Sequence, residues 1–95
     1  MHKDNRILAL LHRLEVEERG WMVVDHWQAD LCAIGIAAND NPRKLVYISV
    51  YDKLEGLYDY ECEAPDGQSD EEYKVVCSGQ NAALDELLAV MNAHL

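Results

Sequence analysis

The chain has 95 residues, of which 49% are apolar and 27% charged, and its formal net charge is −10 at pH 7. This length and composition predict one globular domain over residues 1–95 rather than a disordered chain. The acidity argues against nucleic acid and membrane surfaces as partners because both are negatively charged, and no apolar run reaches the roughly 18 to 20 residues of a membrane span.

The first predicted element is a helix over residues 4–19. Asp4 is placed to cap its N-terminus, and Gly20 is expected to close it. Apolar side chains recur along it at helical spacing, at Ile7, Leu8, Leu10, Leu11 and Leu14. They predict an amphipathic helix with one face on a core.

Five strands are predicted next, over 21–28, 31–38, 44–51, 56–63 and 73–77, where β-branched and aromatic residues are enriched. Turn residues separate them at 39–42, 52–56 and 64–72, and such short connections favour antiparallel neighbours. A second helix is predicted to start at Asn81 as its N-cap and to run to the C-terminus. The expected fold is α+β: a five-stranded, mainly antiparallel sheet with an N-terminal and a C-terminal helix packed on one face.

Side-chain alternation assigns the two faces of this sheet. The residues expected to face the helices are Met22, Val24, Cys32, Ile34, Ile36, Val46, Ile48, Val50 and Val76. Asp59, Glu61 and Glu63 alternate with Tyr58, Tyr60 and Cys62, and burial of three unpaired carboxylates would be costly. The face opposite the helices is therefore expected to carry these acids together with Trp21, Val23, Asp25, Trp27, Leu31, Ala33, Leu45, Tyr47, Ser49 and Tyr51.

The negative charge is concentrated in one segment. Residues 52–72 hold nine of the eighteen acidic residues and a single base, Lys53, which leaves a charge of −8 there. The segments 1–20, 21–51 and 73–95 carry only 0, −1 and −1. A local negative field attracts a basic protein and raises the rate of encounter.

An aromatic centre with an acidic rim predicts a protein-binding surface. The residues expected to contact a basic protein partner are Asp25, Trp27, Tyr47, Tyr51, Asp59, Glu61, Glu63, Asp66, Asp70, Glu71 and Glu72. The alternative interpretation is structural: the aromatics would serve cross-strand packing, and the acidic segment would be a solvated loop.

The patterns that indicate catalysis or cofactors are weak. Asp25 and His26 are adjacent, so on a strand they would point to opposite faces, and no nucleophile motif surrounds Cys32. The four histidines lack metal-ligand spacing, and the scattered glycines form no phosphate-binding loop. The sequence therefore predicts no enzyme, no cofactor and no metal.

The three cysteines, Cys32, Cys62 and Cys77, are odd in number and widely spaced. That pattern fits neither a disulfide framework nor a zinc site, so three reduced and mostly buried thiols are expected. The N-terminus also lacks the features of a signal peptide. A cytoplasmic location is the corresponding expectation.

Four stretches carry a resemblance to a known group: WMVVDHWQADLCAIGIA, LVYISVYDKLEGLYDYECE, YKVVCSG and LDELLAVMNAHL. With its size and acidity, the chain resembles the small immunity proteins of bacterial polymorphic-toxin systems, including contact-dependent growth inhibition. The resemblance implies a cognate toxin as partner, often a basic nuclease, whose active site or substrate channel is covered. Two alternatives stay open: a phage or plasmid nucleic-acid mimic that inhibits a defence nuclease, and a small interaction or ligand-binding domain.

Overall fold

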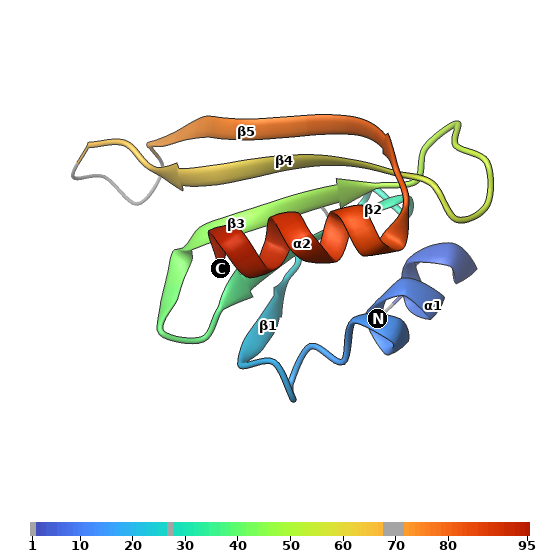
Figure 1. Ribbon diagram of the computed structural model, residues 1–95, viewed down its shortest axis with the longest axis horizontal. Helices are drawn as coiled ribbons and strands as arrows, with labels where there is room; N and C mark the ends of the chain where they lie inside the picture. Colours follow the sequence, from blue (N-terminus) through green and yellow to red (C-terminus); the bar gives the residue numbers. More distant parts are fainter. Residues whose placement is uncertain (1, 27, 68–71) are drawn as a thin grey trace.

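The structure is a computed structural model that describes residues 2–26, 28–67 and 72–95. The elements follow in chain order as α1 (Asn5–Leu14), β1 (Trp21–Val24), β2 (Ala33–Ala38), β3 (Asn41–Ser49), β4 (Tyr58–Pro65), β5 (Tyr73–Ala82) and α2 (Leu84–His94). Within the described residues the five strands form one antiparallel sheet in the order β1-β2-β3-β4-β5 (Figure 1). The predicted α+β class, a five-stranded antiparallel sheet with a helix near each end, is confirmed.

Short hairpins produce this simple strand order. Ala38 pairs with Asn41, so Asn39 and Asp40 alone form the turn between β2 and β3. Two-residue turns rich in Asn and Asp match the twist of antiparallel strands. The turn expected over 39–42 is therefore shorter than predicted, because Asn41 and Pro42 already belong to β3.

One hydrophobic cluster joins the sheet to both helices. Its centre is the cross-strand set Ile34, Ile36, Val46 and Ile48, and all four side chains are fully buried. The helices contribute Ile7, Leu10 and Leu14 from α1 and Leu87 and Met91 from α2. Figure 1 shows α2 in front of the sheet, where it contacts β3 and β4. Burial of each large aliphatic side chain contributes about 1.5 to 3 kcal/mol, so this cluster is the main source of stability.

The first helix begins as predicted and ends earlier. The Asp4 carboxylate accepts a hydrogen bond from the Arg6 backbone N–H at 2.8 Å, which is N-cap geometry. The helix ends at Leu14 because Glu15 adopts a left-handed conformation with φ of 49°. Gly20 does not close the helix; its φ of 76° instead turns the chain into β1.

The face assignment of β1 was wrong by one residue. Trp21 pairs with Ala38 and Val23 with Ile36, so both side chains point to the core, and Trp21 is only 5% exposed. Met22, predicted to be inward, is 37% exposed. All four residues of β1 are apolar, so no polar residue marks the solvent side of this strand.

The end of the sheet also differs from the prediction. β5 continues to Ala82, and α2 starts at Leu84 with Ala83 as an N-cap that makes no side-chain hydrogen bond. Asn81 is not the N-cap; it has φ of 55° and lies where the β4–β5 register shifts. Val76, predicted to be inward, is 50% exposed on this edge strand.

Candidate protein-binding face

Three carboxylates lie in a row along β4, on the face opposite the hydrophobic cluster. Glu63, Glu61 and Asp59 pair across to Leu45, Tyr47 and Ser49 of β3. Alternation places them opposite Tyr58, Tyr60 and Cys62, which are buried in the core. We call Tyr47, Asp59, Glu61 and Glu63 the acidic sheet face. From Asp59 to Glu63 the row spans about 13 Å, since a strand rises about 3.3 Å per residue.

Asp59 has a structural role in this row. Its carboxylate lies 3.0 Å from Lys53 Nζ and accepts a hydrogen bond from the Asn81 backbone N–H at 3.1 Å. The same Lys53 ammonium donates to the Asn81 side-chain oxygen at 3.1 Å. This network holds the irregular end of β5 against β4, and it neutralises Asp59 within the chain.

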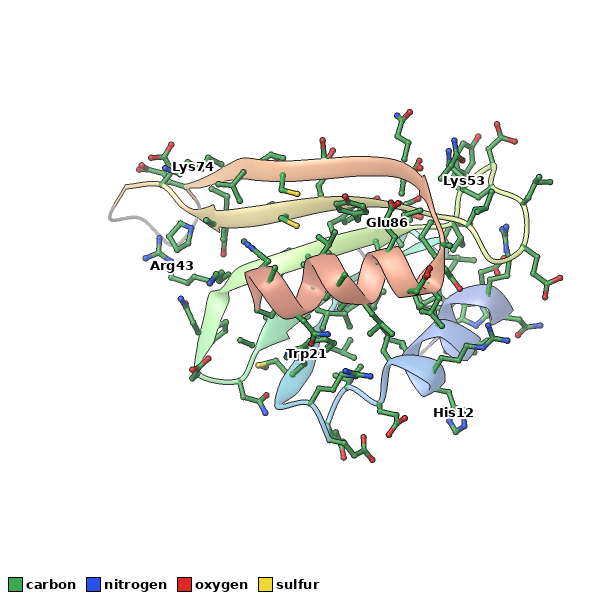
Figure 2. The ribbon with its side chains drawn as sticks, viewed as in Figure 1. His12, Trp21, Arg43, Lys53, Lys74 and Glu86 are labelled. Atoms are coloured by element: carbon green, nitrogen blue, oxygen red, sulfur yellow. The ribbon has the colours of Figure 1, made fainter. Side chains whose placement is uncertain are left out.

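The electrostatic environment of Glu61 and Glu63 differs from that of Asp59. Burial and then the neighbouring Glu61 charge raise the pKa of Glu63, while His26 acts in the opposite direction. Neither glutamate forms an ion pair with a Lys or Arg among residues 2–26, 28–67 and 72–95. Figure 2 shows Lys53 near one end of β4 and Arg43 and Lys74 near the other. The middle of the acidic sheet face is therefore the part where added positive charge would be most favourable.

Tyr47 lies beside these acids and is only half-buried. Its hydroxyl is 3.5 Å from Asp30 Oδ2. Burial, and then the Asp30 charge, raise the pKa of Tyr47, so the phenol stays protonated and can donate a hydrogen bond. Tyr47, Glu61 and Ser78 help to line a depression with a volume of about 300 Å³.

The face is less open than the sequence predicted. Ala33, Ala37 and Leu45 point to this side, yet their exposure is at most 1%. The connection between β1 and β2 comes close to this part of the face, because Asp30 contacts Tyr47 and His26 affects Glu63. Among the described residues, Tyr47 and the β4 carboxylates form the centre of the exposed part of this face, with Met22 and Val75 at its margins.

Asp25, a predicted contact residue, forms an internal ion pair. Its Oδ1 lies 2.9 Å from Lys3 Nζ, whose side chain is fully buried. This contact lacks the alignment of a hydrogen bond, whereas the ammonium donates to the Asp30 carbonyl at 2.7 Å. Asp25 and Lys3 therefore fix the N-terminal segment to the β1–β2 connection.

Three further predicted contact residues, Tyr51, Asp66 and Glu72, lie near the two ends of the sheet. Tyr51 is 73% exposed, but it lies in the β3–β4 connection after β3 has ended, near the equally exposed Leu54. Asp66 and Glu72 are exposed where the Asp66 N–H donates to the Glu72 carbonyl at 2.8 Å. Three predicted residues, Trp27, Asp70 and Glu71, lie outside the described residues.

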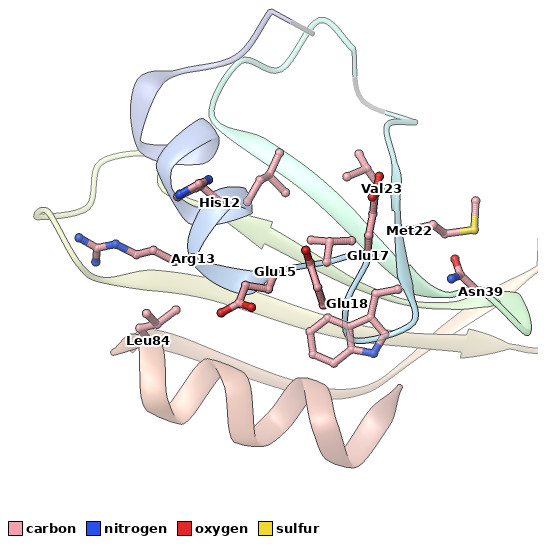
Figure 3. Close-up of a pocket in the computed structure, with 12 residues that line it drawn as sticks. His12, Arg13, Glu15, Glu17, Glu18, Met22, Val23, Asn39 and Leu84 are labelled. Carbon is pink, nitrogen blue, oxygen red and sulfur yellow. The ribbon is translucent and has the colours of Figure 1, made fainter.

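A second concave surface, which the sequence did not predict, lies between the two helices. This cleft has a volume of about 1260 Å³ and is formed by the end of α1, the turn over 15–20, β1 and the start of α2 (Figure 3). Its lining combines the apolar Leu11, Val16 and Trp21 with the exposed Glu17 and Glu18. Sequence patterns missed it because its shape depends on how residues 11–23 fold back on themselves and lie beside Asn39 and Leu84.

The described part of the chain brings no three His, Cys, Asp or Glu side chains together in a way that could hold a metal ion. None of its helices is long and apolar enough to cross a membrane. Comparisons with protein-family models, with curated proteins and with solved structures find no match.

Proposed function

We propose that this chain is an immunity-type inhibitor, which binds a basic toxin domain through the acidic sheet face. The observation that carries the proposal is the pair Glu61 and Glu63, two like charges on one strand face without a Lys or Arg ion pair in the described residues. A cation supplied by a partner would relieve their repulsion and form charge-assisted hydrogen bonds. The resemblance to immunity proteins supports the same interpretation.

The proposed partner is a nuclease domain, because such a domain must present Lys and Arg to bind phosphates. Carboxylates held on a strand match those cations at fixed spacing and exclude the nucleic acid from them. Inhibition is then occupancy of the active site or substrate channel, with no catalysis by the inhibitor. A nuclease of this kind acts on cellular nucleic acid, so we place the inhibitor in the cytoplasm. A nucleic-acid mimic directed at a defence nuclease would use the same face.

The test uses a basic toxin nuclease domain as the partner, sought first among the products of the adjacent genes. Its nuclease activity is measured with the wild-type chain, with Glu61→Gln/Glu63→Gln, and with the control Glu17→Gln/Glu18→Gln. Both variants remove two negative charges, but only the first changes the acidic sheet face. The proposal predicts inhibition by the wild type and the control and weakened inhibition by the first variant. Full inhibition by all three would show that the face is not the binding surface.

The cleft between the helices favours a second candidate, a small-ligand or interaction domain. Its volume of about 1260 Å³ is somewhat above the roughly 300 to 1,000 Å³ of typical ligand pockets, and buried Trp21 contributes to an apolar wall. If the cleft is the binding site, Glu17→Gln/Glu18→Gln, on the cleft rim, would change the binding of its ligand or partner, and Glu61→Gln/Glu63→Gln would not. The two variants therefore separate the two functions.

A further inference from the structure

Two of the three cysteines meet across the edge of the sheet. Cys62 of β4 and Cys77 of β5 are direct register partners in an antiparallel pair. Such partners have Cα atoms about 4.5 to 5.5 Å apart, which lies within the range of about 4.4 to 6.8 Å that a disulfide requires. As direct register partners, the two cysteines project their side chains from the same face of the sheet, next to each other.

Cys32 cannot substitute for either partner. It lies directly before β2, where its carbonyl accepts a hydrogen bond from the Val50 backbone N–H, whereas Cys62 pairs with Val46. Two strand spacings and four residues along the strand separate Cys32 from Cys62, a distance of about 16 Å. This is well beyond the roughly 7 Å limit for a disulfide without backbone movement.

The exposure of the two thiols differs. Cys62 is fully buried, whereas Cys77 is exposed on the edge strand. Burial, and then the proximity of Cys77, raise the pKa of Cys62 to about 12. Cys77 is therefore the thiol that an oxidant in solution reaches, and Cys62 is the adjacent thiol that can resolve the product.

We propose that Cys62 and Cys77 form a reversible dithiol–disulfide site that responds to small-molecule disulfides. The Cys77 thiolate attacks one sulfur of the oxidant and releases one small thiolate, which leaves a mixed disulfide on Cys77. The Cys62 sulfur, as it loses its proton, attacks the Cys77 sulfur and releases the second small thiol. Two protein thiols are oxidised to one disulfide, and one small disulfide is reduced to two thiols.

The disulfide would act on the exposed edge of the sheet. β5 is an edge strand whose register against β4 shifts between Cys62 and Glu63, directly beside this pair. A covalent bond there fixes β5 to β4 and restrains the hairpin between residues 62 and 77. In a reducing cytoplasm the pair stays as two thiols, so the bond would form under oxidising conditions.

Trypsin provides a direct test because it places the three cysteines on separate peptides, 20–43, 54–74 and 75–95. Dilute native protein is incubated with oxidised glutathione, free thiols are alkylated, and the digest is analysed by mass spectrometry. The proposal predicts peptide 54–74 linked to 75–95 within one chain, with 20–43 alkylated, and separation of the linked peptides by dithiothreitol.

The variants Cys32→Ser and Cys77→Ser serve as matched controls. The first should retain the linked peptide, and the second should lose it. The oxidised wild type should also show slower hydrogen exchange of β4 and β5 amides than the reduced protein. Glutathione retained on Cys77 in the wild type, a link that involves Cys32, or only intermolecular disulfides would each overturn the proposal.

Discussion

Replacement of Gly79 by alanine tests the packing at the exposed edge of the sheet. Gly79 pairs with Tyr60, and a Cβ atom at this position would lie 2.5 Å from two ring carbons of Tyr60 and 2.6 Å from its hydroxyl oxygen. Ordinary contacts need about 3.5 Å or more, so the ring must move by about 1 Å. Tyr60 is only 8% exposed and belongs to the core cluster, which leaves the ring little room. Overpacking of this kind costs about 1 to 3 kcal/mol.

A double-mutant cycle separates this clash from other effects of the substitution. The free energy of unfolding is measured by urea denaturation for the wild type, Gly79→Ala, Tyr60→Leu and the double variant. In the Tyr60→Leu background alanine should be neutral or stabilising by about 0.4 to 1 kcal/mol, because it restricts the unfolded chain. The loss of stability should therefore disappear or turn into a gain. An equal loss of stability in both backgrounds would refute the proposed contact between position 79 and the Tyr60 ring.

Four further predictions concern the core and the acidic sheet face. Trp21→Ala should lower the free energy of unfolding by about 3 to 5 kcal/mol, measured by urea denaturation, because Trp21 is buried in the core. Asp59→Ala should cost about 1 kcal/mol in the same assay, since it removes the acceptor for Asn81 and the partner of Lys53. The raised pKa of Glu63 means that the folded state holds this proton more tightly than the unfolded state, so stability should fall as pH rises from 4.5 through the raised value. Denaturation from about pH 4 to pH 7 should show a smaller fall for Glu63→Gln than for the wild type. Trp27→Ala, at a position that the sequence predicts to contact the partner, should weaken partner binding by at least roughly tenfold in a titration.

Side-chain alternation predicted the faces of a strand correctly where polar and apolar residues alternate clearly along it. In β4, acids alternate with Tyr and Cys, and the structure places Glu61 opposite Tyr60 and Cys62 as predicted. In β1 the run from Trp21 to Val24 offers no such contrast, and the pairing of Trp21 with Ala38 decides its orientation. Cross-strand register, a tertiary property, was the missing information.

The remaining differences also have tertiary causes. Asn81 has the sequence features of an N-cap, but it serves in a β-bulge because Asp59 and Lys53 bind it there. Cys77 was expected to be buried, yet β5 lies at the sheet edge and leaves it exposed. The proximity of Cys62 and Cys77 depends on β4–β5 pairing, so their spacing in the sequence could not predict it.

The most direct test of the acidic sheet face is the rate of association with the basic toxin domain that the chain inhibits, measured at low and high ionic strength. We expect Glu61→Gln/Glu63→Gln to slow association at low salt and to reduce the salt dependence, because the face steers the encounter. The control Glu17→Gln/Glu18→Gln, which changes the net charge equally, should have a smaller effect. Equal rates for the wild type and Glu61→Gln/Glu63→Gln at every ionic strength would contradict a binding role for this face.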